Sequence, residues 1–234
     1  MVSEVDISNL ALGYLGDSAN VSSLNPPDSV QAEHCQRFYP LARDALLNMH
    51  HWGFATKRVQ PAQIAVPAAA AGMWLYAYIS PSDCLTIQRV YDPSASDDFV
   101  TGIPQPYDGF WPGSSSYPAS SSGMTGVVTA KPFAVETDAN GDDIIYSNQA
   151  NAAIAYTAQI TDTTKFSAPF IVAHAWLLAS YLAGPIIKGT EGIKMAQACL
   201  KAFASAKVAA AESDANERRV DSINSATAPW MAGR

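Results

Sequence analysis

The twenty residues from 168 to 187, APFIVAHAWLLASYLAGPII, contain no Asp, Glu, Lys or Arg, and this stretch constrains the fold more than any other. Its length is about that of a membrane-spanning helix. The Gly184-Pro185 pair is expected to end the helix at about Ala183, and His174 lies within it. A helix that is apolar all round is buried either in lipid or at the centre of a protein. We favour a central core helix, because other parts of the chain supply amphipathic helices to surround it; a single membrane span is the alternative.

Two amphipathic helices are predicted near the N-terminus. The first begins with a capping box at Ser3 and Asp6 and ends at Gly16. The second covers about 29–50 and should kink near Pro40, which removes a backbone donor from the helix interior. Its apolar positions are predicted to share one stripe, made of Val30, His34, Phe38, Leu41 or Ala42, Ala45 and Met49.

A last helix is expected to be capped by Thr190. Its predicted stripe is Ile193, Ala196 or Gln197, Leu200, Phe203 or Ala204, and Lys207 or Val208. Residues 205–217 have too few large apolar side chains to form core. They should therefore either project into solvent or pack on another chain through small residues.

The middle of the chain has the composition of β-structure. Aromatic and β-branched runs predict strands at 74–79 and 85–91, and a further strand is predicted at 153–160. Residues 133–137 and 144–146 flank an Asp-Ala-Asn-Gly-Asp-Asp turn and predict a hairpin. The region between these strands, 93–125, is rich in Pro, Gly and Ser but carries aromatic residues that linkers seldom have, so part of it is expected to dock on something.

These elements predict an α+β fold. Residues 1–55 and 165–217 should form an antiparallel bundle of about four helices, and 56–164 an inserted, antiparallel β-rich region that contains the long loop. Residues 218–234 are expected to form an extended C-terminal tail.

Charge and cysteine content exclude some function classes. The net charge is −7, and only 14 Lys and Arg are scattered along the chain, which argues against non-specific binding to nucleic-acid backbone. The three cysteines, Cys35, Cys84 and Cys199, are far apart and are interpreted as buried thiols of a reducing compartment. The acidic N-terminal segment does not have the pattern of a signal peptide.

Histidines and acidic residues are the candidates for chemistry, and the structural interpretation is favoured for each. His50 and His51 diverge by about 100° on a helix and cannot jointly bind one metal from that geometry. His34 and His174 could approach each other in the fold, but no metal-binding motif accompanies them. The acidic turn contains Asp138, Asp142 and Asp143, which resemble a calcium loop faintly and a hairpin turn better.

An enzyme is therefore not indicated, and no cofactor is expected. A metal-dependent enzyme that uses His34, His50 or His174 is the alternative from another class. The segment His50-His51-Trp52 is instead expected to lead the chain out of the helices, with Trp52 and Phe54 anchoring the exit. The Arg43-Asp44 pair is expected to be solvated and worth little.

An ordered set of motifs lies in residues 5–92: ISNLALGYLGD, SSLNPPDS, CQRFYPLARDALLNMHHWGFATKR and YAYISPSDCLTIQRVYD. Together they resemble the head-to-tail adaptors of short-tailed bacteriophages, the tail tubular protein A family. The patterns that carry the resemblance are FYPxxRDxLL, H-x-W-x-FAxKR and P-x-D-C-L. Weaker similarity continues through Thr161-Asp162, the start of the apolar helix and the last helix, so it covers most of the chain.

The resemblance implies a non-enzymatic virion protein at the head-tail junction, assembled in the host cytoplasm. Identical subunits would form a ring, commonly dodecameric, between the portal protein and the tail tube or nozzle. DNA would pass through its channel without sequence-specific binding, and no membrane would be involved. An acidic channel would repel phosphate, and the low charge content, 15%, suits flanks covered by neighbours.

Two sets of residues are the candidates for contact with partners. Those expected to contact the portal are Arg218, Arg219, Trp230 and Met231. Those expected to contact the tail or a neighbouring subunit are Phe99, Tyr107, Phe110, Trp111, Tyr117, Lys57 and Arg58.

Overall fold

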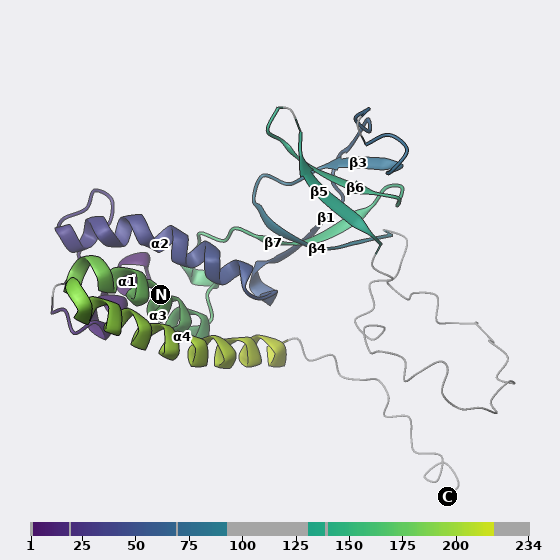
Figure 1. Cartoon of the computed structure of the whole chain (residues 1–234). Coiled ribbons are helices and arrows are strands. Elements are labelled where there is room, and N and C mark those ends of the chain that lie inside the picture. Colours follow the sequence, from purple (N-terminus) through teal and green to yellow (C-terminus); the bar gives the residue numbers. More distant parts are fainter. Residues whose placement is uncertain (1, 19, 69, 93–130, 139, 218–234) are drawn as a thin grey trace, which may run out of the picture. The chain divides into compact units, whose positions relative to one another are not determined.

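The computed structural model describes residues 2–18, 20–68, 70–92, 131–138 and 140–217. Four α-helices and antiparallel β-structure confirm the α+β class (Figure 1). The chain divides into two compact units. Of the described residues, one unit comprises 2–57, 83–86 and 156–217 and contains the helices; the other comprises 58–82, 87–92 and 131–155.

The first helix, α1 (Glu4–Tyr14), has the predicted ends. The Ser3 hydroxyl accepts a hydrogen bond from the Asp6 amide at 3.1 Å, and the Asp6 carboxylate accepts one from the Ser3 amide at 2.8 Å, which is the capping box. Gly16 has a φ of 76°, and the Asp17 amide donates to the Leu12 carbonyl. The helix therefore closes with the left-handed glycine that such a stop requires.

The second helix, α2 (Val30–Asn48), begins at the N-cap Ser29 and continues through Pro40, which is exposed. The predicted stripe was right only in part: Ala42 is buried and Phe38 and Ala45 pack against the core, whereas Val30, Leu41 and Met49 are exposed. The face that packs on the other helices consists of Ala32, Cys35, Tyr39, Ala42, Arg43, Leu46 and Leu47. Most of these positions follow the predicted ones by a residue, which corresponds to about 100° around the helix. Hydrophobicity alone selected the other face because small or polar residues, such as Ala32 and Arg43, occupy the buried one.

The apolar stretch forms α3 (Ala168–Ile187), capped at Ser167, whose hydroxyl accepts from the Phe170 amide. The prediction that Gly184-Pro185 ends it was wrong: the helix continues for another turn, to Ile187. Pro185 is tolerated there because the lost amide bond lies in the last turn and the helix ends at Lys188, which has a φ of 62°.

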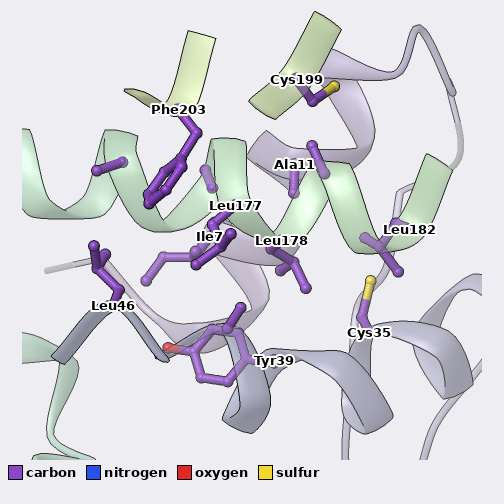
Figure 2. Close-up of a cluster of buried hydrophobic side chains, with 14 of the residues drawn as sticks. Ile7, Ala11, Cys35, Tyr39, Leu46, Leu177, Leu178, Leu182, Cys199 and Phe203 are labelled. Atoms are coloured by element: carbon purple, nitrogen blue, oxygen red, sulfur yellow. The ribbon is translucent and has the colours of Figure 1, made fainter. Parts of the chain in front are cut away.

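The helix α3 packs against each of α1, α2 and α4. Figure 2 shows side chains from α1, α2 and α4 converging on its three leucines, Leu177, Leu178 and Leu182. Among the described residues, α3 is the one helix long and apolar enough to cross a membrane by length and composition. The core helix of a soluble protein meets the same criterion, and these packing partners account for its apolar residues.

The last helix, α4 (Gly189–Glu217), follows α3 almost without a loop. It begins one residue before Thr190, so Thr190 lies in the first turn and is not the cap that was predicted. Gly192 contacts the end of α3 closely: a Cβ at this position would lie 3.0 Å from the Ala183 carbonyl oxygen. The absence of a side chain thus allows the two helices to approach each other there.

The described strands form two sheets. One has three strands in the order β1-β7-β4, and these strands are Thr56–Val59, Ala153–Ala158 and Cys84–Tyr91. The other has four strands in the order β2-β3-β6-β5, which are Gln63–Ile64, Tyr76–Ile79, Asp143–Ser147 and Phe133–Thr137.

The predicted hairpin is confirmed, because β5 and β6 pair antiparallel with Thr137 opposite Asp143. The two predicted strands on either side of Ser80–Asp83 also form, as β3 and β4, but they belong to different sheets. A small core of Ala70, Ala77, Ile144 and Tyr146 supports the four-stranded sheet.

Candidate functional site

The α2 outer stripe is an apolar face that lies beside the buried face of this helix. It consists of Val30, His34, Phe38, Leu41, Ala45 and Met49, of which Phe38 and Ala45 are half-buried against the core. Val30, Leu41 and Met49 are between 47% and 66% exposed. Scattered exposed aliphatic side chains are ordinary, but a stripe that repeats along a helix is the pattern of an interaction face.

The helix α4 also has two apolar faces. Its core face repeats at Gly192, Cys199, Phe203, Ala210 and Asp214. The α4 outer stripe consists of Ile193, Gln197, Leu200, Ala204, Val208, Ala211 and Ala215. Its three large members are between 46% and 61% exposed. The sequence prediction had not separated the two faces, since it left Phe203 or Ala204 open in the stripe that begins at Ile193.

The two outer stripes meet at a shallow depression of about 400 Å³ in the helical unit. It is lined by Met49 and His50 from the end of α2 and by Lys207, Val208, Ala211, Glu212 and Ala215 from α4. Small side chains on α4 leave this space open, and acidic and basic side chains stand at its edge. An apolar side chain from a partner would fit such a space.

A polar link holds the C-terminal half of α4 beside the depression. The buried Asp214 carboxylate accepts a hydrogen bond from the Gly53 amide at 2.7 Å, and its other oxygen lies 3.4 Å from His50 Nε2. Gly53 begins the short 3₁₀ helix η1 (Gly53–Ala55), so Asp214 satisfies an amide that the turn leaves open. The sequence alone did not identify Asp214; only the repeat of the α4 core face, in which it is the last member, marks it as buried.

The exit from α2 is anchored as predicted. Trp52 is fully buried, donates from its indole nitrogen to the Leu46 carbonyl at 3.0 Å, and packs edge-on against Phe170 with ring centroids 5.0 Å apart. Phe54 packs on the same Phe170 ring at 5.0 Å. His50 lies edge-on against Trp52 at 4.8 Å. These contacts give His50 and Trp52 structural roles at the joint.

His174 is fully buried among aromatic rings, so its imidazole does not reach the surface. Its ring is 4.7 Å from that of Tyr39 and 6.2 Å from that of Phe170. Burial lowers the pKa of His174 to about 4, and the Arg43 guanidinium acts in the same direction. This environment favours the neutral imidazole.

The described residues contain no group of three or more His, Cys, Asp or Glu side chains that could hold a metal ion. His174 lies inside the helical core, whereas His50 lines the surface depression and lies 3.4 Å from the buried Asp214. In the acidic turn, Asp138 accepts from the Asn140 and Asp142 amides at 2.8 and 2.9 Å, as a hairpin turn requires.

The Arg43-Asp44 pair is not the solvated pair that was predicted. Arg43 is only 6% exposed, and its Nε donates to Asp44 at 2.8 Å. The other Asp44 oxygen accepts from Gln159 at 2.8 Å. A buried guanidinium needs a charged partner, so Asp44 is needed to compensate the buried charge of Arg43.

The cationic candidates separate into two cases. Lys57 forms an ion pair with Asp83 at 2.6 Å, and Asp83 also accepts from the Tyr156 hydroxyl at 2.9 Å. The hydrogen bond from Lys57 holds the pKa of Asp83 below its usual value. Lys57 is thus tied within its own chain, although half of its side chain is exposed. Arg58 follows it in β1 and is exposed.

The remaining candidates lie outside the described residues. These are Arg218, Arg219, Trp230 and Met231 in the C-terminal tail, and Phe99, Tyr107, Phe110, Trp111 and Tyr117 in the long loop.

Comparisons with known proteins return no match: no protein-family model matches the chain, and no curated protein matches it at a significant level.

Proposed function

We propose that this chain is a head-to-tail adaptor of a short-tailed bacteriophage, a structural virion protein that forms a ring between the portal and the tail tube or nozzle. The observation that carries the proposal is the ordered series of motifs in residues 5–92, which resembles that family. The ring, dodecameric in the usual case, would surround the channel through which DNA leaves the capsid.

The roles of the motif residues support a structural function. In FYPxxRDxLL, Tyr39, Arg43 and Leu46 face the core of the helical unit. In the following motif, Trp52 and Phe54 pack edge-on against Phe170. Motifs that encode a joint between elements are expected in an assembly subunit, whereas an enzyme's motifs would supply reactive side chains.

The α2 outer stripe supports an assembled state. Phe38, Leu41 and Tyr181 line an apolar depression of about 510 Å³ between α2 and α3. A ring interface is heterologous, so each subunit needs two different complementary surfaces. The α2 outer stripe is a candidate for one of them. The four helices would form an antiparallel bundle in the ring, and residues 218–234 would reach the portal.

The experiment combines purified chain with portal-bearing capsids that lack it, followed by negative-stain imaging. A ring of extra density at the portal vertex is the expected result, and its absence would contradict the proposal. Deletion of 218–234 should abolish attachment. This deletion retains Asp214 and its bond to Gly53, so the shortened chain should keep the circular dichroism and melting temperature of the full chain.

A charge on the α2 outer stripe tests the ring interface separately. Leu41→Glu should prevent ring closure, because a carboxylate would be buried at an apolar contact. The matched control is Arg37→Glu, an exposed position one turn away whose side chain forms an ion pair with Glu33 at 3.1 Å. If the Leu41→Glu variant still formed closed rings, the α2 outer stripe would not be a ring interface.

A further inference from the structure

The α4 outer stripe has a spacing that is symmetric about Ala204. Its members follow one another at intervals of four, three, four, four, three and four residues, from Ile193 to Ala215. Reversing the direction of the helix therefore superimposes the stripe on itself. Ile193 falls opposite Ala215, Gln197 opposite Ala211, Leu200 opposite Val208, and Ala204 opposite Ala204. Such intervals are those of a helix-helix packing seam.

Side-chain size is complementary in the reversed arrangement. The N-terminal half of the stripe carries the larger side chains Ile193, Gln197 and Leu200, and the C-terminal half ends in Ala211 and Ala215. The depression of about 400 Å³ lies over that C-terminal half. A reversed second helix would place its own Ile193 at this depression, where small residues leave room for it.

Charge is complementary as well. Lys194 and Glu212 lie on the same flank of the stripe, because they are separated by five turns of helix. In the reversed pairing about Ala204, Lys194 of one copy lies near Glu212 of the other, and this occurs twice. Lys201 on the same flank falls near Ser205, so no like charges meet there. In a parallel pairing, Lys194 of one copy and Glu212 of the other would lie about 27 Å apart along the helix axis, so this attraction would be absent.

We infer that the α4 outer stripe is the interface of an antiparallel helix pair between two copies of this chain. Such an interface is isologous and closes at two copies, so it cannot by itself build a ring. It goes beyond the adaptor proposal and describes the chain before assembly. The pairing would cover α4 in the free protein.

Oligomeric state tests the inference directly, by sedimentation of the full chain over a range of concentrations. The expected result is a monomer-dimer equilibrium. Leu200→Glu should weaken dimerisation at least about a hundredfold, because two carboxylates would enter the seam. Ala198→Glu, also exposed on α4 but about 120° from the stripe, should leave it unchanged. Both variants should keep the wild-type helical circular dichroism. A chain that is monomeric throughout, or equal dimerisation by the two variants, overturns the inference.

Charge reversal tests the register. Lys194→Glu should weaken the dimer by about tenfold, because two attractions become two repulsions. The double variant Lys194→Glu with Glu212→Lys should restore it. Lys194 also pairs with Glu191 in its own chain, but both side chains are 71% exposed, so that loss is small. Failure of the double variant to restore dimerisation would contradict the antiparallel register.

Cysteine pairing tests the direction. In an equimolar mixture of Leu200→Cys and Val208→Cys chains, oxidation should give chiefly the mixed disulfide, identified by peptide mass spectrometry. A parallel pair would give each variant's own disulfide, and that outcome overturns the inference. The adaptor proposal is tested independently by density at the portal vertex, so either idea can fail without the other.

Discussion

The helices α3 and α4 differ in what their apolar residues do. In α3, residues on nearly every side are buried, since α1, α2 and α4 surround it. In α4, one apolar face packs on α3 while a second, the outer stripe, stays exposed. An apolar helix face becomes part of the core only when enough neighbouring helices are present to cover that face. An apolar face left uncovered indicates a partner instead.

The largest expected effect is in the first turn of α3, where Phe170 lies in the aromatic cluster. Phe170→Ala should lower the free energy of unfolding by about 3–5 kcal/mol, because it removes a fully buried ring that Trp52, Phe54 and Phe166 contact. Urea unfolding followed by circular dichroism measures it. Val172→Ala, on the exposed side of α3, is the control and should cost less than about 1 kcal/mol. Equal costs would show that α3 is not the core helix.

His174 makes the stability of this core dependent on pH. Its pKa is about 4 in the folded chain and 6.5 in the unfolded chain, so the unfolded state binds more protons between these values. Its contribution is therefore complete above pH 6.5 and is lost as the pH falls toward 4. Between pH 7 and pH 5 the loss is about 2 kcal/mol.

His174→Leu isolates this effect from the titration of carboxylates, which is common to both proteins. The difference in unfolding free energy between pH 7 and pH 5 should shrink by about 2 kcal/mol in the variant. If the unfolding free energies of the two proteins changed with pH in the same way, His174 would not be the source of the pH dependence.

The polar link at the end of α4 should contribute less than the aromatic core. Asp214→Ala should cost about 1–3 kcal/mol, because the Gly53 amide loses its acceptor. Glu212→Ala, an exposed acid on the same stretch of α4, should change stability by no more than about 0.5 kcal/mol. Similar costs would mean that the end of α4 is not held by this link.

The smallest effect is expected on the α4 outer stripe. Leu200→Ala, measured at a protein concentration at which the chain is monomeric, should change the unfolding free energy by no more than about 0.5 kcal/mol. Phe203→Ala, three residues along the same helix but buried against α3, should cost about 3 kcal/mol or more. A larger cost for Leu200→Ala than for Phe203→Ala would mean that the outer stripe, and not the Phe203 face, packs on α3.

The ends of α1 and the β5-β6 hairpin were predictable because the deciding groups are close in sequence, whereas the end of α3 and the start of α4 were not. Ser3 and Asp6 bond to each other across one turn, and the Asp138 turn brings β5 and β6 together within a few residues. The sequence failed where the decision was not local. The buried face of α2 was misassigned because Val30 and Leu41 are more hydrophobic than Ala32 and Arg43, which contact the other helices.

The candidate site was predicted less well than the fold. The sequence drew attention to His50 and to Trp52, and both belong to the joint at the end of α2. It did not identify Asp214, because an acid in an alanine-rich helix shows no sign of the amide it will meet across 161 residues.

By itself, the sequence determined the class of the fold, the positions of its helices and hairpin, and the presence of one helix apolar enough to be central. These follow from periodicity, capping and turn chemistry, which act over a few residues. Only the tertiary structure decided which of two apolar faces on α2 and α4 is covered, and which acid holds the end of α4. Burial depends on neighbours that are distant in sequence, so that choice is made when the helices pack.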